Sequence, residues 1–107
     1  MIIEHHNSIA IITQEKTSLK EFSTKFSVLY ERFKEDDIVL NLKDISVGSL
    51  DLLVSISKQH RLLNHSFVVV TTQLNQDDFE DDFIIVPTLQ EAKDFIEMDL
   101  LSRDLGI

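Results

Sequence analysis

The stretch that decides the fold runs from Asp37 to Val70 and reads DIVLNLKDISVGSLDLLVSISKQHRLLNHSFVVV. Its first apolar run, Ile38 to Leu42, has the unbroken hydrophobicity of a strand that is buried on both faces. A second such run, Phe67 to Val70, follows after the length of one helix. Two buried strands joined by one helix indicate a parallel crossover, the building block of α/β sheets. We therefore predict an α/β fold in which these two strands are parallel neighbours.

The chain before this unit predicts a hairpin followed by a helix. Short β-rich runs at residues 2–4 and 9–13 are separated by a turn in which Asn7 tolerates a positive φ. Ser18 and Glu21 then have the spacing of a capping box at a helix start. The apolar residues at helical spacing are expected to be core: Leu19, Phe22, Phe26, Leu29, Tyr30 and Phe33.

The helix inside the deciding stretch is expected to begin near Ser49 and to end near Leu63. A serine at this place is a natural N-cap. Asn64 follows where a left-handed residue commonly ends a helix, and asparagine is the best choice there after glycine. The side chains expected to face the sheet are Leu50, Leu53, Ile56 and Leu63.

The remaining chain predicts an acidic loop, one strand and one helix. Residues 73–82 are polar, and residues 83–86 are apolar and read as a strand. Thr88 and Glu91 form a second capping box, which opens a helix that runs to about Leu105. The expected order of elements is ββαβαβ, then a loop, then βα.

The last helix carries apolar residues on two sides. At 100° per residue, one stripe should meet the sheet and the other points nearly the opposite way. The first stripe is Leu89, Ala92, Ile96 and Leu100, and the second is Met98, Leu101 and Leu105. A helix that is apolar on both sides usually covers something further. We expect the second stripe either to be a protein contact, with a partner or in a homodimer, or to fold back over the edge of the core.

Composition places the chain among single globular domains. Its 107 residues, 43% of them hydrophobic, suffice for one core, so we expect a single domain over residues 1–107. The absence of cysteine fits a reducing compartment. With no visible signal peptide or membrane-spanning run, the expected location is the cytoplasm. A net charge of −9 argues against binding to nucleic acid and to anionic membranes.

The sequence resembles the STAS domain family of sulphate transporters and anti-sigma factor antagonists. The resemblance is carried by NLKDIS at a strand end, by LDLLVSISKQHRLLNHSFVVV as helix and next strand, and by VPTLQEAKDFIE as the last strand-to-helix corner. It implies a mixed sheet with helices packed against it and a non-enzymatic regulatory module that docks a protein partner through residues 46–60. The implied contact residues are Val47, Gly48, Leu50 and Asp51.

The same resemblance implies a phosphoacceptor serine before this helix. Ser49 lies closest to that region, and Ser46 is the second candidate. The loop here is about three residues shorter than the family's Asp-Ser-Ser-Gly-like loop, and it lacks the aspartate and the double serine. A phosphate on Ser49 would be stabilised by the free N–H groups and the dipole of a helix start. The alternative is that Ser49 only caps the helix.

The end of the chain, VPTLQEAKDFIEMDLLSRDLGI, is also similar to that of small marine Bacteroidetes proteins often labelled ribonuclease Z. That nuclease needs a dense histidine-aspartate motif for two metal ions, and the sequence has none. The similarity therefore implies an accessory partner of the RNA-processing enzyme rather than a nuclease. A further alternative is small-ligand binding, since some STAS domains bind nucleotides or lipids.

No residue pattern predicts catalysis, a metal site or a cofactor. The sequence has no glycine-rich phosphate loop and no nucleophile-elbow motif. His5 and His6 point to opposite faces of a strand, and His60 and His65 lack a ligand spacing. The acidic residues 77–82 lack the glycine of a calcium loop. Asp44 is the one aspartate at a strand end that could serve a receiver-like phosphoacceptor fold.

Overall fold

The five strands lie side by side in the order in which they occur in the chain. A computed structural model describes residues 1–105 and places them in one sheet, β1-β2-β3-β4-β5. The strands are β1 (Ile2–His6), β2 (Ile9–Thr13), β3 (Asp37–Asn41), β4 (Phe67–Val70) and β5 (Ile84–Val86). The helices are α1 (Leu19–Leu29), α2 (Asp51–Leu62) and α3 (Leu89–Asp104), with short 3-10 turns η1 (Tyr30–Phe33) and η2 (Gln76–Asp78). The α/β class is confirmed, while the last two residues of the expected 1–107 domain lie outside the described part.

The deciding strands pair as predicted. β3 and β4 are parallel, with Ile38 opposite Phe67 and Val39 opposite Val68. β2 and β5 extend the parallel sheet on either side, and β1 alone is antiparallel. Every residue of β4 is buried, because helices cover both faces of the sheet.

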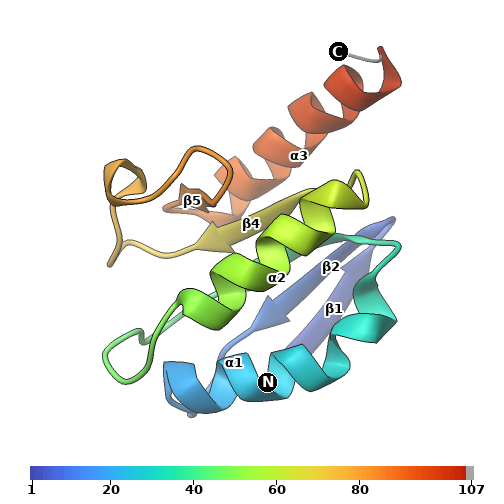
Figure 1. The fold of residues 1–107 in the computed structure, drawn as a ribbon. Coiled ribbons are helices and arrows are strands. Elements are labelled where there is room, and N and C mark those ends of the chain that lie inside the picture. Colours follow the sequence, from blue (N-terminus) through green and yellow to red (C-terminus); the bar gives the residue numbers. More distant parts are fainter. Residues whose placement is uncertain (106–107) are drawn as a thin grey trace.

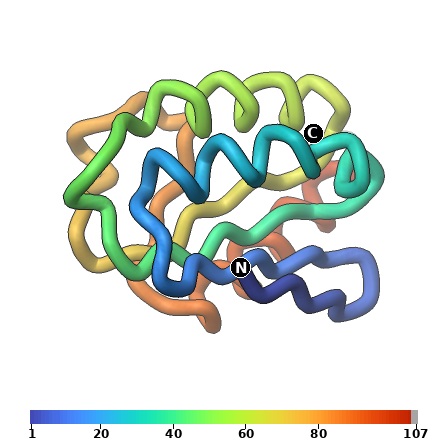
Figure 2. Tube along the Cα trace, turned by 90° about the horizontal axis from the view of Figure 1, so that it is seen from below, coloured from blue at the N-terminus to red at the C-terminus, as the bar shows by residue number. Residues whose placement is uncertain are grey.

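Two helices cover one face of the sheet and one covers the other (Figure 1). Strand residues alternate between the two resulting cores. The core under α1 and α2 includes Ala10, Ile12, Phe22, Phe26, Ile38, Leu40, Leu53, Ile56, Phe67 and Val69. The core under α3 includes Ile11, Val39, Val68, Val70, Ala92 and Ile96. Figure 2, turned by 90°, shows the β1–β2 hairpin at one margin of the molecule.

Several local predictions are confirmed. Asn7 in the hairpin turn and Asn64 after α2 both have positive φ, 58° and 66°. The hydroxyl of Ser18 accepts the Glu21 N–H at the start of α1, with a donor–acceptor distance of 3.1 Å. Thr88 caps α3 in the same way. These short polar side chains satisfy backbone donors that the first turn leaves free.

Two expectations for α2 were wrong. The helix begins at Asp51 and its N-cap position is Leu50, so Ser49 lies one residue before the cap. The Ser49 hydroxyl bonds to the Asp51 N–H only two residues ahead, and Leu50 already has helical backbone angles. Leu63 does not face the sheet, and 49% of it is exposed. Because α2 ends at Leu62 and the chain turns at Asn64, the leucine between them lies past the core.

The expected sheet-facing stripe of α3 was half right. Ala92 and Ile96 are fully buried, but Leu89 and Leu100 are 36% and 42% exposed. The inner line of α3 instead continues from Ile96 to two polar residues, Asp99 and Arg103, which are partly buried. Those two side chains contact the end of α2 and the start of β3. These contacts fix which side of α3 faces the sheet.

Candidate functional site

The loop between β3 and α2, residues 42–50, lies at the carboxyl end of the central strand. Ligand and partner sites of open α/β sheets favour this edge, because the loops that follow parallel strands gather there. The structure brings most of the predicted site residues together in this loop: Ser46, Val47, Gly48, Ser49 and Leu50. Asp51 follows as the first residue of α2.

A buried glutamine holds the start of the loop. Gln14, which follows β2, is fully buried. Its amide nitrogen donates to the carbonyl oxygens of Thr17 and Asp44 at 2.9 and 2.8 Å. Its amide oxygen accepts the N–H groups of Lys43 and Asp44 at 2.7 and 2.9 Å. One side chain therefore satisfies four backbone groups and fixes the loop to the β2 end.

A second glutamine and helix α1 hold the rest of the loop. Gln73, after β4, donates to the carbonyl of Lys43 at 2.9 Å. The Lys20 N–H in α1 donates to the Val47 carbonyl at 3.0 Å. Gly48 has φ of 132°, and a Cβ there would lie 2.6 Å from the Lys20 nitrogen. Only glycine fits this close approach of loop and helix.

Asp44 and Ser46 form a closed turn at the tip. The Asp44 carboxylate accepts the Ser46 hydroxyl at 2.6 Å and the Ser46 N–H at 2.9 Å. These hydrogen bonds, the hydroxyl first, hold the pKa of the Asp44 carboxyl below its usual value. Because the Ser46 hydroxyl faces a carboxylate, a phosphate on Ser46 would meet like charge.

Ser49 is exposed and differs from Ser46 in its surroundings. Its hydroxyl accepts the Asp51 N–H at 3.1 Å, so it satisfies a first-turn donor without being the N-cap residue. The nearest apolar side chains of the site stand in solvent, with Val47 59% and Leu52 41% exposed. Leu50 is partly buried and packs against the core.

A shallow groove runs beside this loop, between the first turns of α1 and α2. Its volume is about 340 Å³, and it is lined by Lys20, Ser23, Thr24, Gly48, Ser49, Asp51 and Leu52. The Ser23 hydroxyl is buried and has no hydrogen-bond partner within residues 1–105. A buried hydroxyl without a partner carries an energetic cost that the fold tolerates here.

A separate cleft, lined by both polar and apolar residues, lies at the carboxyl ends of β4 and β5. It has a volume of about 610 Å³. Its lining is Thr71, Thr72, Gln73, Leu74, Asn75, Gln76, Asp78, Ile85, Val86 and Pro87. Five of the ten lining residues carry neutral hydroxyl or amide groups and four are apolar, so the cleft offers both hydrogen bonds and apolar contacts to a small molecule.

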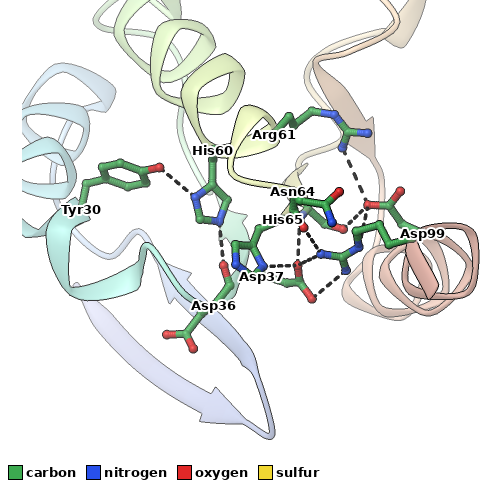
Figure 3. A network of polar contacts seen from close by, with 10 residues as sticks. Tyr30, Asp36, Asp37, His60, Arg61, Asn64, His65 and Asp99 are labelled. Carbon is green, nitrogen blue, oxygen red and sulfur yellow. Dashed lines mark hydrogen bonds and ion pairs between the residues drawn. The ribbon is translucent and has the colours of Figure 1, made fainter. Parts of the chain in front are cut away.

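The opposite end of the sheet holds a polar network that the sequence did not reveal (Figure 3). The Asp37 carboxylate at the start of β3 is only 3% exposed and accepts the Ser66 N–H at 2.8 Å. Arg103, in the last turn of α3, donates to both Asp37 oxygens at 3.1 Å. Asp99 accepts the Ser66 hydroxyl. The network connects α3 to the β3 and β4 starts.

His60 belongs to the same end of the molecule and is fully buried. Its Nε2–H donates to the Asp36 carbonyl at 2.6 Å, so Nδ1 accepts the Tyr30 hydroxyl at 2.8 Å. Burial lowers the pKa of His60, since a charged imidazole loses its hydration there. Burial likewise raises the pKa of Tyr30. A satisfied, neutral histidine in a core is a structural group.

Other candidate residues lie apart from the loop. The outer stripe of α3 is exposed, with Met98 at 70%, Leu101 at 60% and Leu105 at 72%. Within residues 1–105 it does not fold back over the core. The acidic residues of the 77–82 segment are exposed. Across residues 1–105, no three histidine or acidic side chains are grouped as a metal ion would require.

Comparison with protein-family models, with curated proteins and with solved structures gave no match. The STAS resemblance therefore depends on the residues of the sequence alone. None of the helices within residues 1–105 is both long and apolar enough to cross a membrane.

Proposed function

We propose that this protein is a non-enzymatic cytoplasmic interaction module of the anti-sigma factor antagonist type. It docks a protein partner through the β3–α2 loop and the first turns of α2. The observation that carries the proposal is the fixation of this loop by Gln14, Gln73 and Gly48 while Val47 and Leu52 remain exposed. A surface segment held by so many hydrogen bonds, yet carrying exposed apolar side chains, is already ordered for binding.

Preorganisation supports this reading on energetic grounds. Ordering a mobile side chain at an interface costs about 0.5–1.5 kcal/mol. A loop that is already fixed avoids much of that cost, so a small contact can give useful affinity. The groove of about 340 Å³ between α1 and α2 adds a recess that a partner side chain can occupy.

The test uses paired substitutions at the two ends of α2. Val47→Asp with Leu52→Asp should abolish capture of the partner by the tagged protein, measured by quantitative mass spectrometry. Leu62→Asp is the matched control, since Leu62 is 87% exposed at the far end of the same helix. The purified partner is then titrated by calorimetry. Equal binding by the loop variant and the control would refute the proposal.

The identity of the captured protein separates two readings of the module. A kinase-like or sigma-system protein agrees with the regulatory proposal. Ribonuclease Z would instead agree with an accessory role in RNA processing. Either partner must lose affinity for the loop variant if the β3–α2 loop is the docking surface.

Ser49 is the proposed switch residue within the same surface. A phosphate there would meet the free N–H groups at the start of α2, whereas Ser46 already bonds a carboxylate. Incubation with the cognate kinase should modify Ser49 and leave Ser46 unmodified. An unmodified loop under those conditions would remove the switch and leave the docking proposal intact.

The outer stripe of α3 is proposed as a second protein contact, with a partner or in a homodimer. Met98→Glu with Leu101→Glu should change the oligomeric state or the binding of the partner. Sedimentation velocity and calorimetry measure the two effects. If neither changes, the stripe is only an exposed helix face.

One observation favours a different function, small-ligand binding. The cleft of about 610 Å³ at the ends of β4 and β5 has the size of a ligand site. A thermal-shift screen with nucleotides and fatty acids should then give a stabilising compound. Its effect should disappear in Thr72→Val, and the absence of any hit would dismiss this function.

A further inference from the structure

The two edge strands of the sheet, β1 and β5, differ in whether their outward backbone groups are hydrogen-bonded. At the β5 edge, the Gln76 amide oxygen accepts the Ile85 N–H at 2.7 Å, and the amide nitrogen donates to the Phe83 carbonyl at 2.8 Å. One side chain thus occupies a donor and an acceptor that a sixth strand would use. Covering an edge in this way prevents unwanted pairing with other chains.

The β1 edge has no such cover. β1 pairs regularly with β2 over five residues, without a bulge or a proline. His6 and Ile9 flank the two-residue turn, so the backbone groups of His6, Glu4 and Ile2 bond to β2 in this antiparallel ladder. The residues between them point their N–H and C=O groups outward. Ile3 and His5 therefore present four backbone groups at the open edge, and no hydrogen bond to them occurs outside the ladder within residues 1–105.

An apolar groove lies directly beside this edge. It has a volume of about 430 Å³ between β1 and α1. Its lining is Met1, Ile3, Thr24, Lys25, Val28 and Leu29. Val28 is 75% exposed on the helix side. A strand added to β1 would direct every second side chain toward this groove, on the face where Ile3 packs against the core.

The side chains of β1 determine which kind of strand can pair with its open edge. Two copies of β1 paired so that Ile3 and His5 of each chain bond to the other would place Glu4 directly opposite its own copy. Directly opposed side chains have Cβ atoms about 4.5–5.5 Å apart, where like charges destabilise the pair. Repulsion between the two Glu4 side chains therefore disfavours a second copy in this register, and the net charge of −9 on each chain adds to it. A cationic residue opposite Glu4 satisfies the same position.

We propose that β1 receives an extended, antiparallel segment of another protein with the pattern apolar–basic–apolar. The two apolar residues lie opposite Ile3 and His5, on the side of the groove. The apolar residue opposite Ile3 fills the space beside Val28. The apolar residue opposite His5 lies beside the His5 imidazole, whose ring is 6.0 Å from that of Phe33. The basic residue between them faces Glu4. This surface is distinct from the β3–α2 loop, so it adds a second kind of partner.

Two synthetic heptapeptides test the pattern: acetyl-Thr-Thr-Val-Lys-Val-Thr-Thr-amide and the same peptide with a central glutamate. The lysine peptide should shift the amide resonances of Ile3 and His5 and slow their hydrogen exchange. It should bind about two to five times more tightly than the glutamate peptide, as expected for one cross-strand charge pair. The Glu4→Lys variant should reverse this preference.

Two controls keep the result specific. A lysine peptide N-methylated on the amides that face β1 should not bind, whereas methylation of the amides on its other side should leave binding unchanged. Val28→Asp should weaken binding, and Leu62→Asp at the end of α2 should not. Perturbed resonances away from β1, or equal binding of both methylated peptides, would overturn the proposal. Protection of the Ile3 and His5 amides in a dimer of the free protein would also overturn it, in favour of a second copy.

Discussion

Arg103 and Asp37, which are 66 positions apart in the chain, form a two-pronged ion pair with both contacts at 3.1 Å. The planar guanidinium matches the two carboxylate oxygens, and Arg103 also donates to the Asn64 carbonyl at 2.6 Å. Three elements therefore meet at one side chain: the start of β3, the turn after α2 and the last turn of α3. Asp37 is almost fully buried, so it relies on this partner and on the Ser66 N–H for its polar contacts.

Arg103→Ala should lower the free energy of unfolding by about 3 kcal/mol, because it leaves a buried carboxylate without its partner. Urea denaturation followed by circular dichroism measures the change. Asp104→Ala, an exposed neighbour on the same turn, is the control and should change stability little. The double variant Asp37→Asn with Arg103→Met should recover part of the loss. Equal stability of the Arg103 variant and the control would contradict the role of the pair.

His60 should make stability depend on pH. Its pKa is lowered from 6.5 in the folded chain by burial, so below pH 6.5 the unfolded chain binds the proton more readily. Its contribution is thus complete above pH 6.5 and is lost as the pH falls toward the lower folded pKa. Asp36, Asp37, Tyr30 and His65 surround the ring.

The measurement is a set of urea unfolding curves between pH 8 and pH 5 for the wild type and His60→Gln. The variant should be less stable at pH 8, but its stability should fall less between pH 7 and pH 5. Parallel pH profiles of the two proteins would show that His60 is not the titrating group.

Gln14→Leu should loosen the candidate site without unfolding the sheet. The substitution removes two hydrogen bonds to loop N–H groups, worth about 1 kcal/mol each. Hydrogen exchange at the amides of Lys43 and Asp44 should accelerate about tenfold or more, in line with that energy. Amides in the middle of β4 serve as the internal reference. Unchanged exchange at the loop would mean that it is held by other bonds.

Gly48→Ala should strain the contact between the loop and α1. A residue with a side chain at this positive φ costs about 1–3 kcal/mol, and here the new Cβ also meets the Lys20 backbone. The melting temperature should fall, and the Lys20 amide should exchange faster. Ser55→Ala, on the exposed side of α2, is the control. A variant as stable as the control would mean that the loop can move away from α1.

The features that the sequence predicts well are local. Unbroken apolar runs identify β3 and β4 because only a strand covered on both faces needs them. Ser18 and Thr88 identify helix starts by a single hydrogen bond to the third residue ahead, and Asn64 marks a helix end by its tolerance of positive φ. Each of these signals depends on residues within one turn of each other.

The features that the sequence does not reveal depend on distant partners. Gln14 looks like a surface residue, and only the folded chain brings it to the start of the β3–α2 loop, 29 positions away. An arginine near the end of a helix is common because its charge interacts favourably with the helix dipole, so the sequence gives no reason to expect a bond between Arg103 and Asp37. The same bond explains the rotation of α3, because Ala92, Ile96 and Arg103 share one side of the helix. Leucines at 89 and 100 were therefore poor guides to the buried face.

The match between chain order and spatial order of the strands has a consequence for assembly. As the polypeptide leaves the ribosome, each new strand can attach at the growing margin, and none must be threaded between partners that have already paired. Asp37 is synthesised early and lies in an incomplete sheet before its ion-pair partner has been made. The ion pair forms only after the last turn of α3, which carries Arg103, has been synthesised. Nascent chains that end before this turn should therefore open more readily at the start of β3.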